Sequence, residues 1–113
     1  MPTLNKCMKL VNKLVVEKEF YNKREYLPLK LLFAFIELGE ASDAWKKGLD
    51  DEKIAEEIID VIFYLLDAYR FLNAKSPDIV FNRKWRKNMK REKTYGEGHR
   101  KYFDLKKDLG LNV

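Results

Sequence analysis

The spacing of apolar residues along the chain predicts helices rather than strands. Apolar residues recur three or four positions apart, whereas no stretch alternates apolar and polar residues for long. The first apolar stripe predicts a helix over about residues 4–24. This stripe consists of Leu4, Cys7, Met8, Val11, Leu14 and Val15, with Tyr21 further along.

Proline and glycine bound a second helix, which we expect over about residues 28–47. Pro28 disfavours helical geometry at Leu27 and suits the first turn of a new helix. Gly48 is placed to adopt the left-handed conformation that commonly ends a helix. We therefore expect the second helix to stop just before Gly48.

Acidic and capping residues start two further helices, expected over about residues 50–74 and 77–95. The run Asp50–Glu52 places negative charge where a helix dipole favours it, and Ser76 with Pro77 forms a cap and a first-turn proline. Short connections between helices are typical of antiparallel neighbours. The pattern predicts an all-α fold, with four main helices in an antiparallel bundle-like arrangement and a short C-terminal tail.

Length and composition are those of a single domain spanning residues 1–113. A lone cysteine, Cys7, and a lone histidine, His99, exclude a disulfide framework and multi-histidine metal motifs. The longest uncharged stretches, 31–36 and 61–66, fall far short of the roughly 20 apolar residues of a membrane-spanning helix. The N-terminus lacks a signal-peptide pattern. These features lead us to expect a cytoplasmic protein.

Charge is distributed unevenly along the chain. The formal net charge is +5, but residues 37–80 carry a net charge of −6 between two basic segments, 1–36 and 81–107. A basic protein is a candidate for binding nucleic acid or another polyanion. A function must therefore account for an acidic middle as well as for basic ends.

The acidic middle contains two pairs of carboxylates with helical spacing. Glu37 and Glu40 lie three residues apart and share one helix face, and Glu57 and Asp60 repeat this spacing, with Glu56 one turn before Asp60. No lysine lies in residues 55–69, so we expect nothing within that helix to neutralise the acidic band. If the second and third helices pack antiparallel, the two pairs meet.

Two interpretations of these pairs remain open from spacing alone. Charged faces are common on amphipathic helices, so an ordinary solvated surface explains the pattern. The flanking sequences are strongly apolar, however, which places both pairs on largely buried helices. Carboxylates about 4 Å apart repel by roughly 4 kcal/mol at an effective dielectric constant of 20, so four of them need protons or a cation. Oxygen ligands favour Mg²⁺ or Mn²⁺ over zinc.

The tetrapeptides ELGE (37–40) and EIID (57–60), separated by sixteen residues, match the ExxE…ExxD signature of a known family. The chain thereby resembles the MazG-like all-α nucleoside triphosphate pyrophosphohydrolases. The resemblance covers residues 29–67 firmly and extends less specifically to the basic segment around 84–91 and to residues 96–99.

The resemblance implies an enzyme that hydrolyses a (d)NTP to the (d)NMP and pyrophosphate with Mg²⁺, with Mn²⁺ as an alternative. The implied metal ligands are Glu37, Glu40, Glu57 and Asp60. For the residue that aligns or deprotonates the attacking water we choose Glu40, with Glu56 as second choice. Families of this kind assemble as homodimers or homotetramers, which adds a homo-oligomer to the expectations.

Substrate contacts are expected from two further groups of residues. Lys84, Asn88 and Arg91 share one helical face at spacings of four and three, and they are candidates for holding triphosphate oxygens. Tyr64, one turn after Asp60, and Trp45 are candidates for stacking on the nucleobase. A solvated basic face and ordinary core packing are the alternatives for these two groups.

Two other functions compete with this hypothesis. A basic helical protein that binds nucleic acid without catalysis would explain the charge of the C-terminal segment, although no helix-turn-helix or zinc-finger motif is present. A member of the same superfamily specific for phosphoribosyl-ATP or dUTP is the other alternative. The segment DVIFYLL (60–66) lacks the histidine that phosphoribosyl-ATP enzymes usually place after the tyrosine, which weighs against that option.

Overall fold

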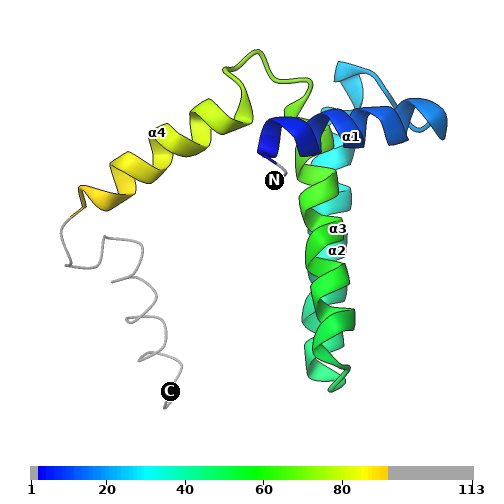
Figure 1. Cartoon of the computed structure of the whole chain (residues 1–113). Helices are drawn as coiled ribbons and strands as arrows, with labels where there is room; N and C mark the ends of the chain where they lie inside the picture. The colour runs from blue at the N-terminus through cyan, green and yellow to red at the C-terminus, as the bar shows by residue number, and fades with distance from the viewer. Residues whose placement is uncertain (1–2, 92–113) are drawn as a thin grey trace. The chain divides into compact units, whose positions relative to one another are not determined.

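The computed structural model describes residues 3–91, which form four α-helices and one short 3₁₀-helix (Figure 1). No strand occurs within residues 3–91, so the predicted all-α fold is confirmed. The elements are α1 (Leu4–Glu17), η1 (Arg24–Tyr26), α2 (Leu27–Lys46), α3 (Asp51–Tyr69) and α4 (Pro77–Met89).

The chain divides after Val80 into two units. The first unit, residues 1–80, contains α1, η1, α2, α3 and the first residues of α4, and it holds the candidate site described below. The rest of α4 belongs to the second unit. The expected C-terminal tail and the glycine-containing stretch 96–99 lie outside the described residues.

A tight reversal joins α2 to α3 and makes them an antiparallel hairpin. Gly48 adopts φ +69°, as predicted, and its N–H donates to the carbonyl of Trp45 over 3.1 Å. The N–H of Leu49 donates to the carbonyl of Ala44, also over 3.1 Å, which completes a Schellman motif. Asp50 caps α3, because its side chain accepts a hydrogen bond from the N–H of Lys53 over 2.8 Å.

Helix α1 crosses one end of this hairpin and packs on α3 (Figure 1). Val11 and Val15 of α1 form a small buried cluster with Leu66 of α3, and Cys7 and Met8 pack against it. The α1 members of the cluster all belong to the apolar stripe from which the first helix was predicted, and Cys7 is a partly buried free cysteine.

The predicted end of the first helix, at residue 24, is wrong. Helix α1 ends at Glu17, and Glu19 adopts the left-handed conformation with φ +54°. The N–H of Phe20 donates to the carbonyl of Val15 over 3.0 Å, as in a second Schellman motif. The sequence carries glutamate where this motif usually has glycine, so the stop signal is absent from the pattern.

Helices α3 and α4 are also shorter than predicted. Helix α3 ends at Tyr69 rather than near Ala74, because the N–H of Phe71 turns to the carbonyl of Ala68 and the Arg24 guanidinium donates to the carbonyl of Phe71 over 2.8 Å. Helix α4 ends at Met89 rather than near residue 95. Its residues from Phe81 onward are all exposed, so tertiary packing does little to extend it.

A buried ion pair connects the two helices of the hairpin at the end next to α1. Lys30 of α2 is 3% exposed, and its ammonium lies 2.5 Å from Oδ2 of Asp67 of α3, which is 5% exposed. The guanidinium of Arg70 donates to the other oxygen of Asp67 from Nη2, over 2.5 Å, and from Nε, over 3.1 Å. Both carboxylate oxygens are therefore paired with cations.

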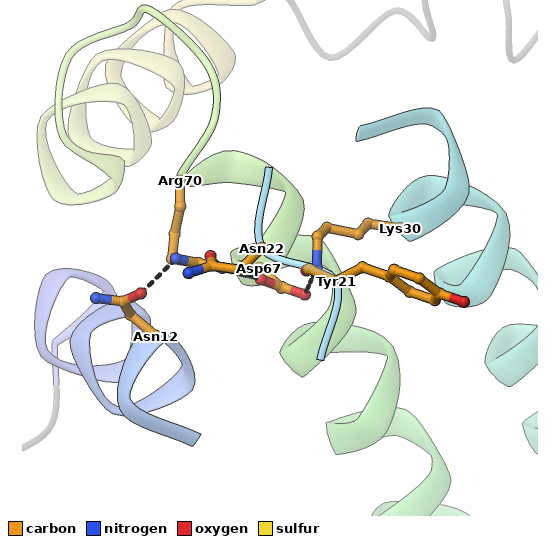
Figure 2. A network of polar contacts seen from close by, with 6 residues as sticks. All are labelled: Asn12, Tyr21, Asn22, Lys30, Asp67 and Arg70. Carbon is orange, nitrogen blue, oxygen red and sulfur yellow. Dashed lines mark hydrogen bonds and ion pairs between the residues drawn. The ribbon is translucent and has the colours of Figure 1, made fainter. Parts of the chain in front are cut away.

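The same two cations reach α1 and the segment that follows it (Figure 2). The ammonium of Lys30 donates to the backbone carbonyl of Tyr21, and the guanidinium of Arg70 donates to the side-chain oxygens of Asn12 and of Asn22. The network thus joins α1, the segment after it, α2 and α3. It contains residues that the sequence analysis did not single out.

We expect Asp67→Asn to lower the free energy of unfolding by about 3–5 kcal/mol, because it leaves the buried Lys30 ammonium without a counter-charge. Urea unfolding followed by circular dichroism measures this loss. Asp43→Asn is the matched control, since Asp43 pairs with Lys47 on the exposed surface of α2 over 2.8 Å. The control should cost at most about 0.5 kcal/mol. Similar losses for the two variants would contradict a structural role for the network.

Glu19→Gly should stabilise the fold by roughly 0.5–1 kcal/mol. The left-handed conformation costs a residue other than glycine about 1–2 kcal/mol, and the larger unfolded-state entropy of glycine offsets part of the gain. Urea midpoints measure the difference. Lys18→Gly introduces the same residue one position earlier, where φ is −92°, and should destabilise instead. A loss of stability in Glu19→Gly would refute the left-handed assignment.

Candidate metal centre

The hairpin places the two carboxylate pairs at the same levels. Glu40 lies six residues before the end of α2 at Lys46, and Glu57 lies six residues after the start of α3 at Asp51. Glu37 and Asp60 are each nine residues from the same ends. Because antiparallel helices rise at the same rate from their connection, each glutamate of α2 lies level with one carboxylate of α3.

Three of the four predicted metal ligands converge within the described residues. A carboxylate oxygen from each of Glu37, Glu40 and Glu57 lies within 4.8 Å of the other two. Asp60 is not in this group of three, but it lines the same pocket as Glu37. The structure therefore brings together three residues of the predicted set and places the fourth beside them.

A lysine neutralises part of the acidic band, contrary to the expectation from the sequence. Lys53 lies one turn before Glu57 on α3, and its ammonium is 3.2 Å from the carboxylate of Glu57 and 4.0 Å from that of Glu56. Residues 55–69 contain no lysine, but Lys53 lies just before them. The ammonium of a lysine reaches a carboxylate four residues further along the same helix. Within the cluster, the carboxylate of Glu57 is therefore paired with Lys53. Glu56 is exposed.

The convergence of carboxylates changes the acidity of Glu37. The pKa of Glu37 is raised to about 7, chiefly by burial and next by a hydrogen bond with Glu40. The negative charges of Glu40, Asp60 and Glu57 act in the same direction. Near neutral pH, the cluster without a cation therefore holds a proton on Glu37 for part of the time. A divalent cation would relieve the same repulsion.

A pocket of about 210 Å³ opens beside the carboxylates. Val11, Leu14 and Val15 of α1 form its apolar wall, and Glu37 and Asp60 supply acidic groups on the hairpin side. Phe20, Phe63, Tyr64 and Asp67 complete the lining. This volume is below the roughly 300–1,000 Å³ of pockets that enclose a drug-sized ligand, so the pocket suits one part of a ligand. No pattern in the sequence indicates that α1 contributes a wall of this pocket.

The two aromatic candidates for base stacking lie in different surroundings. Tyr64 lines the pocket and packs against Phe33, with ring centroids 5.5 Å apart. Burial, followed by the charges of Glu37 and other nearby carboxylates, raises the pKa of the Tyr64 phenol, which keeps it neutral. Trp45 is exposed, does not line the pocket, and lies about 140° around α2 from Glu40. Its role in binding stays a prediction.

The three predicted phosphate-binding residues belong to the second unit. Lys84 and Asn88 are exposed and one turn apart on α4, in agreement with the predicted spacing. Arg91 lies beyond the end of α4 at Met89, so its expected place on the same helical face is wrong. Its N–H donates to the carbonyl of Asn88 over 3.2 Å in a turn. Contact between these residues and phosphate stays a prediction.

Comparison of the chain with protein-family models, with curated proteins and with solved structures finds no match. Within residues 3–91, no helix combines the length and the apolar character that crossing a membrane requires. The arguments about function therefore rest on the residues and the geometry of the site.

The raised pKa of Glu37 predicts how stability depends on pH. Between about pH 4.5 and pH 7, the unfolded chain loses the Glu37 proton while the folded chain keeps it, so stability should fall with rising pH and level off above pH 7. The loss is about 2 kcal/mol after allowance for partial solvent exposure. Thermal unfolding from pH 4.5 to 8 without divalent ions measures it.

Glu37→Gln should flatten this pH dependence, because the variant has no proton to lose at that position. Glu25→Gln is the control, since Glu25 is exposed in η1, away from the cluster. It should leave the slope unchanged. An equal slope in the wild type and in Glu37→Gln would show that Glu37 does not titrate near neutral pH.

Proposed function

We propose that the protein is a Mg²⁺-dependent nucleotide pyrophosphohydrolase that converts a (d)NTP to the (d)NMP and pyrophosphate. The observation that carries the proposal is the convergence of Glu37, Glu40 and Glu57 from two helices, next to a mostly apolar pocket. The ExxE…ExxD spacing and its resemblance to the MazG-like enzymes supply the reaction class. The converging carboxylates support a cation site, and the adjacent pocket supports binding of part of a nucleotide.

The ligand set fits Mg²⁺ or Mn²⁺ on chemical grounds. All donors of the group are carboxylate oxygens, which these hard cations prefer. Glu37, Glu40 and Glu57 would hold the cation, with Asp60 beside them as a fourth ligand or as a ligand of a second ion. A bound cation of this kind neutralises phosphate oxygens and lowers the pKa of a coordinated water.

The surroundings of the two candidate bases favour Glu40 over Glu56. Glu40 belongs to the converging group and shares a hydrogen bond with Glu37, so its carboxylate lies among the implied metal ligands. Glu56 is exposed, lies outside the converging group, and its carboxylate is 4.0 Å from the ammonium of Lys53. We therefore keep Glu40 as the residue that aligns or deprotonates the attacking water.

The remaining parts of the nucleotide are assigned to the pocket and to the basic helix. The apolar wall from α1 and the ring of Tyr64 line the same pocket and suit the flat apolar faces of a base. Lys84, Asn88 and Arg91 would bind phosphate oxygens as cations and an amide, and Trp45 remains a second aromatic candidate. The proposal includes a cytoplasmic homo-oligomer, a dimer or a tetramer.

The direct test is incubation of the full-length protein with a panel of (d)NTPs and Mg²⁺, followed by separation of the products. We expect a nucleoside monophosphate and pyrophosphate, and Mn²⁺ should substitute for Mg²⁺. Formation of a nucleoside diphosphate and orthophosphate, or no turnover across a broad panel, would refute the proposal. Salt-dependent binding of DNA or RNA without turnover would favour the nucleic-acid-binding alternative.

Glu40→Gln should lower kcat by at least about 100-fold, the usual contribution of general acid–base catalysis. Its helicity and cooperative unfolding should persist, because the side chain is exposed. Asp43→Asn removes the same charge one turn further along α2, outside the converging group, and should retain activity. Mg²⁺ should raise the Tm of the wild type more than that of Glu40→Gln. Equal activity in both variants would exclude Glu40 from the chemistry.

A further inference from the structure

The segment between α1 and η1, residues 18–23, supplies an aromatic side chain to the pocket beside the carboxylates. Phe20 of this segment lines the pocket together with Val11 and Val15 of α1. Val11 and Val15 are buried, whereas Phe20 is 55% exposed. Phe20 therefore lies at the open edge of the pocket, where a bound ligand would cover part of its ring.

Backbone contacts on both sides of Phe20 hold it at this edge. The N–H of Phe20 donates to the carbonyl of Val15 over 3.0 Å, directly after Glu19 with its left-handed conformation. The carbonyl of the next residue, Tyr21, accepts a hydrogen bond from the buried ammonium of Lys30. The position of Phe20 is thus set by contacts that its own side chain does not make.

Arg70 holds the same segment through the side chain of Asn22 (Figure 2). Nη2 of Arg70 donates to Oδ1 of Asn22 over 3.0 Å, and Nη1 donates to Oδ1 of Asn12 on α1. Helix α1 has a second attachment, because Val11 and Val15 belong to the buried apolar cluster. All six residues of the segment are exposed and none belongs to that cluster, so the segment depends more on its polar contacts.

Asp67 connects these polar contacts to the pocket. Its carboxylate is paired with Lys30 and Arg70, the two cations that hold the segment, and Asp67 also lines the pocket. Lys30, Arg70 and Asn22 do not line it. These three residues therefore act on a ligand in the pocket only through Asp67 and Phe20.

From these contacts we infer that Phe20 stacks on the base of the nucleotide and that Asn22 and Arg70 are positioning residues for its ring. The inference rests on the proposed function in one respect, namely that the pocket takes the base. An aromatic ring stacks favourably on a planar ligand, and a segment already held in place does not have to be ordered when the ligand binds. The contacts should act on affinity and leave the chemical step unchanged, because the segment lies outside the group of converging carboxylates.

Phe20→Ala tests the contact with the base. It should raise KM for the best nucleotide of the panel by about 10-fold, within the range that base–aromatic stacking contributes, and leave kcat within about 2-fold. Phe35→Ala is the matched control, because Phe35 is also exposed but does not line the pocket, and its KM should equal that of the wild type. An unchanged KM in Phe20→Ala would overturn the inference.

A pair of asparagine variants tests the positioning role. Asn22→Ala removes the hydrogen bond between Arg70 and the segment, and it should raise KM by about 5-fold with kcat unchanged. Asn12→Ala removes a hydrogen bond from the same guanidinium on the α1 side. Its KM should stay within about 2-fold of the wild type, because the apolar cluster still holds α1. Equal increases in KM for the two variants would show that Asn22 has no positioning role.

Isothermal titration calorimetry with AMP, GMP, CMP, UMP and dTMP separates this inference from the proposed function, since these ligands carry a base but no pyrophosphate to release. The Kd of the best of them should rise in Phe20→Ala by about the same factor as KM. Binding that Phe20→Ala weakens, without turnover of any triphosphate, would support the inference and count against the proposed hydrolysis alone. Turnover with the same KM and Kd in Phe20→Ala, or no binding of any nucleotide, would refute the inference.

Discussion

The buried ion pair between Lys30 and Asp67 is the contact on which the register of the hairpin depends. Lys30 lies sixteen residues before the end of α2, and Asp67 lies sixteen residues after the start of α3. The two residues of the pair are therefore level with each other, as are the carboxylates nearer the connection. A shift of one helical turn would leave the buried ammonium of Lys30 without its counter-charge, at a cost of several kcal/mol. The pair therefore holds Glu40 level with Glu57.

The hairpin thus contains two opposite electrostatic arrangements along one interface. Near α1, opposite charges are buried in contact and every buried polar side-chain atom of the described residues has a partner. Nearer the connection, like charges converge at Glu37, Glu40 and Glu57. Like charges in contact lower the stability of the hairpin. Their convergence is therefore typical of a functional site, where stability is given up for binding, rather than of a structural contact.

Local signals predicted the parts of the structure that local interactions determine. Gly48 and Asp50 define the reversal between α2 and α3, and from it the meeting of the two carboxylate pairs follows by counting residues. The end of α1 was missed because Glu19 takes a conformation that usually selects glycine. The ion-pair network and the α1 wall of the pocket depend on how α1 crosses the hairpin, and no spacing within one helix reports such a crossing.

The contact between Lys53 and Glu57 gives the cluster an internal counterion. The ammonium occupies one carboxylate of the acidic group before any divalent ion arrives, which lowers the repulsion that the folded chain must tolerate. In the proposed metal site, a divalent cation would have to compete with the tethered ammonium of Lys53 for Glu57. Lys53 would therefore put weakly binding monovalent ions at a disadvantage without being a ligand itself.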